Sequence, residues 1–228
     1  MSTSSGAGKS NLSRKELKKM NRNKSKFDKY KVTTMSTKTA CVNVYMDSFP
    51  IEKVRFQAML YDKSLPKEQR SINCYLDFEE MACLAEDCKS GRIFKKIQDA
   101  GKGGLVISRG GNTKSKLYEG GIESRIISLG MTGEGDNAKV YVNLTRGKGK
   151  TSATGLIMPD GAPDVKISVG LTPAAFRGKM LLANEEKCAY LAHMVNALVK
   201  EAIAERESGT LNTELEDGPS EGTIITED

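Results

Sequence analysis

The chain has 228 residues, a formal net charge of +6 and an apolar fraction of 38%, and it contains few aromatic residues and no tryptophan. This length suffices for one sizeable domain or two small ones. No apolar run approaches the length that spans a bilayer, and the N-terminus lacks the apolar stretch of a secretory signal. The sequence therefore predicts an intracellular, cytoplasmic protein without a membrane segment.

The charge is unevenly distributed along the chain. Residues 1–31 carry ten Lys or Arg against two acids, whereas residues 205–228 carry eight acids against a single Arg. Both ends lack sustained apolar periodicity, which is typical of disordered segments. We therefore expect a basic disordered arm over residues 1–36, a folded core over residues 37–207 and an acidic disordered tail over residues 208–228.

The first half of the core predicts three strands followed by a helix. The segments rich in β-branched and aromatic residues are residues 39–46, 53–61 and 71–76. Asp77, with Glu80 three residues later, forms a capping-box pattern. Apolar residues then follow at helical spacing until Gly91, which suits a helix stop.

The second half predicts four strands and a long helix. The strands are expected over residues 104–109, 122–131, 139–145 and 165–171. Asn184 suits the N-cap of a helix to about residue 207, with apolar positions at Cys188, Leu191, Val195, Leu198 and Ala202. The predicted fold is α+β, with two repeats of antiparallel strands followed by a helix and a long C-terminal helix. An OB-like barrel is the alternative.

No catalytic or metal-binding pattern stands out. The run Gly6–Ser10 lacks both the first glycine and the preceding strand of a phosphate-binding loop. The single histidine, His193, falls within the last predicted helix, and the paired acids lie in first helical turns, where the helix dipole favours them. The five cysteines are an odd number without a C-x-x-C pair, which favours reduced thiols. We expect no enzyme, no cofactor and no metal.

Basic residues gather on the strands and glycine-rich connections of the second half. Glycine lets a backbone approach a phosphate closely, lysine supplies the charge, and nearby tyrosines can stack on unpaired bases. Any single one of these residues fits the solvent face of a half-covered sheet equally well, so the hypothesis depends on their number. The expected nucleic-acid contacts are Arg55, Arg109, Lys114, Lys116, Arg125, Tyr141, Arg146, Lys148 and Lys150.

The order of these elements resembles that of the Whirly and Pur-type single-stranded nucleic-acid binders. The resemblance covers about residues 37–205 and depends on two stretches in which a strand leads into a helix, residues 71–91 and 165–207. It implies a β-β-β-β-α unit that occurs twice, with curved sheets that present basic and aromatic residues to unpaired strands. The first half shows one strand fewer than this plan unless residues 31–38 begin another.

These patterns predict a single-stranded DNA-binding protein of low sequence specificity that acts in DNA replication, recombination or transfer. An RNA-binding or transcription-regulating module stays open, and so does a non-catalytic assembly or scaffold protein. In the assembly case, the apolar stripe over residues 188–203 mediates self-association into a homo-oligomer. The acidic tail can contact the core or protein partners through salt-sensitive electrostatics.

Overall fold

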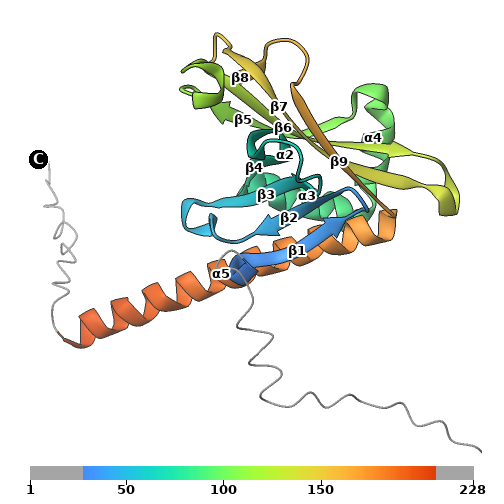
Figure 1. Cartoon of the computed structure of the whole chain (residues 1–228). Helices are drawn as coiled ribbons and strands as arrows, with labels where there is room; N and C mark the ends of the chain where they lie inside the picture. Colours follow the sequence, from blue (N-terminus) through green and yellow to red (C-terminus); the bar gives the residue numbers. More distant parts are fainter. Residues whose placement is uncertain (1–27, 209–228) are drawn as a thin grey trace, which may run out of the picture. The chain divides into compact units, whose positions relative to one another are not determined.

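The computed structural model describes residues 28–208 (Figure 1). The chain divides into two compact units at the junction between Cys188 and Ala189. Among the described residues, every strand lies in the first unit, and the second unit consists of the last part of the C-terminal helix. Residues 1–27 of the expected arm and residues 209–228 of the expected tail lie outside the described residues.

The first sheet, sheet A, contains four antiparallel strands in the order of the sequence. A 3-10 turn, η1 (Asp28–Tyr30), precedes them, and η2 (Phe49–Ile51) and the short helix α2 (Lys67–Arg70) connect them. The strands are β1 (Lys31–Ser36), β2 (Ala40–Tyr45), β3 (Lys53–Leu60) and β4 (Ser71–Asp77). The strand β1 lies within residues 31–36, which were expected to belong to the disordered arm, and it supplies the fourth strand of the first half.

Two helices follow sheet A in the sequence. Helix α3 (Phe78–Ser90) begins with the expected capping box, in which the Glu80 carboxylate accepts the backbone N–H of Asp77 at 3.0 Å. Gly91 ends this helix at a φ of 79°, a left-handed conformation that glycine adopts without steric cost. The sequence did not predict helix α4 (Arg92–Asp99), which starts directly after this glycine.

The second sheet, sheet B, contains five antiparallel strands built around one long strand. The connecting turns are η3 (Gly101–Gly103), η4 (Lys116–Tyr118) and η5 (Gly135–Asn137). The strands are β5 (Leu105–Asn112), β6 (Glu123–Thr132), β7 (Lys139–Thr151), β8 (Ile157–Pro159) and β9 (Val165–Leu171). The first part of β7 pairs with β9 and its last residues pair with β8, so the glycine-rich run after Arg146 is strand rather than loop.

Helix α5 (Pro173–Glu207) begins eleven residues before the expected N-cap at Asn184. Pro173 occupies the first helical position, and the Thr172 hydroxyl accepts the backbone N–H of Ala175 at 3.2 Å, which is an N-cap contact. Within the first unit, Phe176 and Met180 of α5 are buried. From Leu191 onward, the apolar residues of α5 are exposed.

Each sheet has one apolar and one polar face because its strands alternate. In sheet A, the apolar face is fully buried and includes Val42, Val44, Val54, Phe56, Ile72 and Leu76. Phe78 of α3 packs edge-on against Phe49 at 5.3 Å, and Lys179 of α5 donates to Thr33 of β1 at 3.2 Å, so both helices lie on this side. The corresponding buried residues of sheet B are Ile127, Leu129, Val140, Val142, Leu144, Ile167 and Val169.

Three side chains of sheet B donate hydrogen bonds to the backbone of β4, the strand at the edge of sheet A. β4 is an edge strand, and its outward carbonyl groups need partners once they are buried. These partners come from β7, β6 and β5. The bonds run from Arg146 to the Ser71 carbonyl (3.2 Å), from Arg125 to the Asn73 carbonyl (3.3 Å) and from Ser108 to the Tyr75 carbonyl (3.0 Å). We call Ser108, Arg125 and Arg146 the edge clamp.

A buried carboxylate holds one member of the edge clamp in place. Glu123 is 1% exposed and accepts bonds from Arg125 Nε (2.6 Å) and from the Ser115 hydroxyl (2.5 Å). Burial by itself raises the pKa of Glu123, but the hydrogen bonds from Arg125 and Ser115 and the charge of Arg125 outweigh it, so the pKa lies below its ordinary value of 4.5. Ionised Glu123 therefore stabilises the fold.

The fold class predicted from the sequence is confirmed. The molecule is α+β, and antiparallel strands followed by a helix occur twice, first as β1–β4 with α3 and then as β5–β9 with α5. The strands form two separate sheets, so the OB-like alternative does not describe the arrangement of residues 28–208.

We predict that Glu123→Gln lowers the free energy of unfolding by about 3 kcal/mol at neutral pH, because it removes one partner of a buried ion pair. Since the folded pKa of Glu123 is depressed, its contribution is complete above about pH 4.5 and is lost as the pH falls through the folded pKa. Urea unfolding of the wild type and the variant should therefore converge in acid. Glu79→Gln, at an exposed position of α3, is the control. An equal loss in both variants would contradict this account.

Candidate nucleic-acid interface

The polar face of sheet A is organised in three rows that cross the strands. Residues that pair across antiparallel strands lie on the same face of the sheet. The rows follow the observed register through β2, β3 and β4. They are Tyr45, Arg55 and Tyr75; Asn43, Gln57 and Asn73; and Cys41, Met59 and Ser71.

A hydrogen-bond network fixes the first of these rows. Asp47 accepts Arg55 Nε at 2.9 Å and Arg55 NH2 at 2.5 Å, and the Asn73 side-chain oxygen accepts Arg55 NH1 at 3.2 Å. The same guanidinium group lies 4.0 Å from the centre of the Tyr45 ring. Arg55 is only 8% exposed, and its bonds to Asp47 and Asn73 and its stack on the Tyr45 ring hold its guanidinium group rigidly at the floor of this face.

The middle row consists of amide side chains. The Asn43 oxygen accepts the Thr34 hydroxyl at 2.8 Å, and the Gln57 oxygen accepts the Tyr45 hydroxyl at 3.3 Å. Asn43 is buried and its amide nitrogen also donates to Cys41 Sγ at 3.7 Å. Gln57 and Asn73 are half-buried, and because an amide has both donors and acceptors, they keep hydrogen-bonding capacity beyond these contacts. Such groups can pair with the edges of unpaired bases.

This face is hollowed and carries an excess of positive charge. A cavity of about 680 Å³ lies over the rows and reaches the helix α2. Four of its lining residues are basic and one is acidic; these are Lys31, Arg55, Lys67 and Arg70 against Asp47. Two apolar groups on the face remain accessible, since Tyr75 is 40% exposed and Met59 is 37% exposed. The hollow therefore combines cations, amides and stacking surfaces.

The outer face of sheet B has a second hollow of related character. Its volume is about 630 Å³. The lining combines basic and other polar side chains with glycines, serines and two apolar residues: Lys102, Lys166, Tyr141, Asn143, Gln98, Thr132, Ile97 and Met131. Two of the lining residues are basic and none is acidic. Ser128, Asn143 and Ser168 form a cross-strand row, in which Ser168 donates to the Asn143 oxygen at 2.7 Å. Both sheets therefore present a polar, positively charged face.

The residues predicted as nucleic-acid contacts do not lie on one surface. Arg55 lies on the polar face of sheet A, and Tyr141 lies on the outer face of sheet B, each at the central position of a cross-strand row. Arg125 and Arg146 belong to the edge clamp, where their guanidinium groups hold backbone carbonyls of β4 or α2.

The other predicted contacts surround these faces. Arg109, on β5, and Arg125 line a small cavity of about 220 Å³ between β4 and β5. Lys114 and Lys116 are exposed on the connection between β5 and β6. At the far end of β7, Lys148 is exposed, and Lys150 forms an ion pair with Asp160 at 3.2 Å. The role of all nine residues in binding stays a prediction.

Sequence reasoning missed most of the polar face of sheet A. Lys31 lies in the expected arm, Lys67 and Arg70 lie between two predicted strands, and the amides of the middle row carry no charge. A signal was present, because polar residues alternate with apolar ones along β3 and β4. The alternation shows which residues share a face of one strand, but only the register between β2, β3 and β4 shows which polar residues lie side by side.

Other reactive side chains of the described residues do not form a second kind of site. Cys41, Cys74 and Cys88 are buried, and Cys83 and Cys188 are exposed. Burial raises the pKa of Cys74 and of Cys88 to about 12, so both are neutral thiols at physiological pH. Between residues 28 and 208, no group of three or more His, Cys, Asp or Glu side chains is arranged to hold a metal ion.

Comparisons with known proteins identified no similar protein. A scan against protein-family models, a search of curated proteins and a search of solved structures found no match to this chain. Within the part of the chain that the structure describes, no helix combines the length and the apolar character needed to cross a membrane.

Proposed function

We propose that this chain is a non-catalytic, cytoplasmic single-stranded DNA-binding protein of low sequence specificity, which acts in DNA replication, recombination or transfer. The observation that carries the proposal is the hollow on the polar face of sheet A, with four basic residues against one acidic residue beside accessible Tyr75 and Met59. The basic rim attracts phosphates, and the rings and amides contact bases.

Two features favour an unpaired strand over a duplex. Stacking on Tyr75 or Met59 requires the flat face of a base, which a duplex hides inside its own stack. The amide row can reach base edges only where these edges are free of a complementary strand. The resemblance to Whirly and Pur-type binders agrees with this interpretation and stays a hypothesis.

The first test is the dependence of affinity on salt. Asp47 neutralises Arg55, so with about three cations at phosphates the slope of log affinity against log salt for an unpaired oligonucleotide should be about −2. Lys67→Met should weaken binding and make this slope shallower by about 0.7, because one phosphate contact is lost. Lys95→Met, at an exposed position of α4, is the matched control and should leave the slope unchanged. Fluorescence anisotropy at several salt concentrations measures both; a flat salt dependence would refute the mechanism.

The second test removes the stacking surface. Tyr75→Ala should weaken binding of an unpaired oligonucleotide by about tenfold at constant salt, because one stacked base loses its ring. The fold should persist, since the edge clamp uses only the backbone carbonyl of Tyr75. Tyr75→Phe keeps the ring and should bind as the wild type does. If Tyr75→Ala binds with unchanged affinity, the polar face of sheet A is not the binding surface.

RNA is the nearest alternative ligand, because an RNA-binding or transcription-regulating module would use the same surface. Competition between unpaired DNA, unpaired RNA and duplex DNA in the same anisotropy assay separates these functions. The proposal expects unpaired DNA to compete best.

Assembly of several copies is a second candidate function, favoured by the end of α5. Phe176, Met180 and Ala183 are buried at helical spacing, and the same spacing continues through Leu191, which is 39% exposed, and Leu198, which is 60% exposed. Exposed apolar side chains in such a stripe commonly mark an interaction surface.

We predict that the full chain sediments as a homo-oligomer if this stripe mediates assembly, and that the double substitution Leu191→Ser and Leu198→Ser shifts it to the monomer. Substitution of the exposed polar residues Asn196 and Lys200 on the same helix by Ala is the control. A wild type that sediments as a monomer at high concentration excludes assembly as the function.

A further inference from the structure

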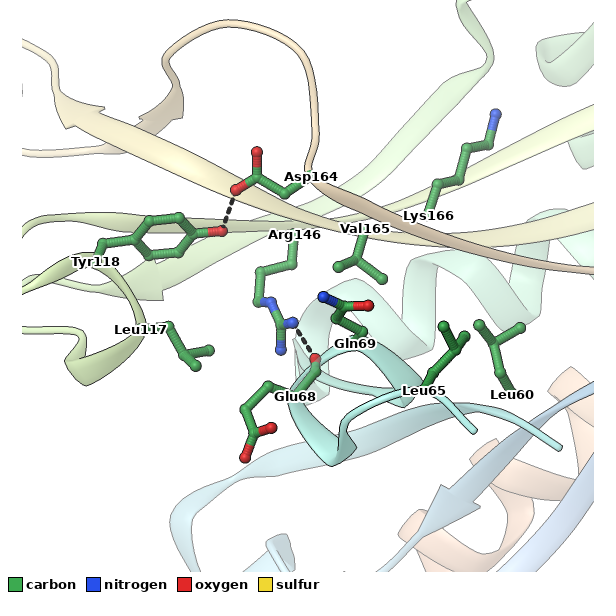
Figure 2. Close-up of a pocket in the computed structure, with 10 residues that line it drawn as sticks. All are labelled: Leu60, Leu65, Glu68, Gln69, Leu117, Tyr118, Arg146, Asp164, Val165 and Lys166. Atoms are coloured by element: carbon green, nitrogen blue, oxygen red, sulfur yellow. Dashed lines mark hydrogen bonds between the residues drawn. The ribbon is translucent and has the colours of Figure 1, made fainter. Parts of the chain in front are cut away.

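A separate pocket lies between α2, η4 and the start of β9 (Figure 2). Its volume is about 530 Å³, which falls within the range of small-molecule and nucleotide-sized sites. Four apolar side chains line it, Leu60, Leu65, Leu117 and Val165. The remaining lining residues are polar or charged: Glu68, Gln69, Tyr118, Arg146, Asp164 and Lys166.

The polar groups of this pocket include a carboxylate held by a tyrosine. The Tyr118 hydroxyl donates to Asp164 Oδ2 at 2.6 Å, as Figure 2 shows. Burial and this bond raise the pKa of Tyr118 to about 12, so the hydroxyl stays protonated and orients the carboxylate. Within residues 28–208, Asp164 Oδ1 has no hydrogen-bond partner, and Oδ2 keeps a further lone pair beside the Tyr118 bond, so the carboxylate can accept two donors from a ligand.

The pocket also contains unsatisfied donors. Arg146 is 8% exposed, and it donates to the carbonyl groups of Ser71 and Glu68 but to no carboxylate of the described residues. Its Nε has no hydrogen-bond partner among residues 28–208. A buried guanidinium with donors left over is costly unless a further acceptor approaches it. Gln69 also lines the pocket, and its amide adds another donor.

These groups fit a flat ring with donors on one edge and an acceptor on another. The charges balance, with Arg146 and Lys166 against Glu68 and Asp164, so a neutral ring suits the pocket better than a free anion. Guanine presents two adjacent N–H donors, N1–H and N2–H, that a carboxylate accepts together, and its O6 accepts from Arg or Gln. Cytosine and adenine offer a carboxylate one amino group, and thymine offers one imide N–H between two carbonyls.

The pocket adjoins the polar face of sheet A across α2. Lys67 and Arg70 of this helix line the hollow on the polar face, whereas Glu68 and Gln69 line the pocket. Leu60 lines both. A strand that lies on the polar face can therefore turn one base around α2 into the pocket.

We propose that this pocket binds one unpaired guanine base of a strand held on the polar face of sheet A, with the base edge on Asp164 and its ring between Leu65 and Leu117. This inference rests on the proposed function and adds a base preference to a surface that otherwise has little sequence specificity.

The test compares an oligo-dT with the same oligo-dT carrying a single guanine, by fluorescence anisotropy at constant salt. The guanine should raise the affinity of the wild type about tenfold, since one bidentate contact distinguishes bases to about this extent. Asp164→Asn should abolish this preference and leave the affinity for oligo-dT unchanged, because an amide cannot accept two donors. Asp160→Asn, in the same connection between β8 and β9, is the matched control and should keep the preference. Both positions are exposed, so the fold should persist.

The outcomes separate this inference from the proposed function. If oligo-dT binds with salt-dependent affinity but guanine adds nothing, or if Asp164→Asn keeps the preference, the pocket assignment is wrong and the proposed function stands. If neither oligonucleotide binds in a salt-dependent manner, both are wrong. Guanosine monophosphate, added in excess, should compete with the guanine-containing strand and not with oligo-dT. Binding of the free nucleotide without any guanine preference in the strand would also overturn the proposal.

Discussion

The arrangement of the first unit depends on how sheet B satisfies the open edge of sheet A. Buried backbone carbonyls need partners. The edge strand β4 pairs with β3 on one side, and no strand of sheet A lies on its other side to supply partners there. Ser108, Arg125 and Arg146 provide these partners from three strands of sheet B. Because the bonds end on backbone atoms, the side chains of Asn73 and Tyr75 can take part in the polar face of sheet A, where Asn73 accepts a bond from Arg55. The edge clamp therefore satisfies the backbone of β4 without covering the candidate site on the polar face of sheet A.

This arrangement separates cations that the fold uses from exposed cations. Replacing Arg125 or Arg146 by a neutral residue would leave carbonyl groups of β4 without their hydrogen-bond donors. Lys67, by contrast, is exposed and is accessible to a ligand. Arg55 lies between these cases, since Asp47 and Asn73 hold it but its flat group reaches the hollow. A count of positive charges along the sequence therefore overstates the positive charge that is available at the surface of the described residues.

The fold could be predicted well from the sequence because its signals are local. Strand composition located β2, β3 and β4, and the Asp77 and Glu80 pattern located the start of α3. Strand β1 was not predicted, because it begins within a basic run. The start of α5 was predicted at Asn184, a common N-cap residue, whereas the helix begins at Pro173 after Thr172. The site was predicted less well for a physical reason. Arg125 and Arg146 bond to residues 52 and 75 positions away in the sequence, and no local pattern reveals such partners.

The most direct test of the account is a photo-crosslinking map. An unpaired DNA strand carrying a photoreactive thymine analogue is irradiated with the full chain, and the attached peptides are identified by mass spectrometry. The account predicts crosslinks on the polar face of sheet A, at Met59, Lys67 and Tyr75, with suppression by added salt. Crosslinks confined to residues 1–27, or spread evenly over the surface with the polar face unlabelled, would contradict it.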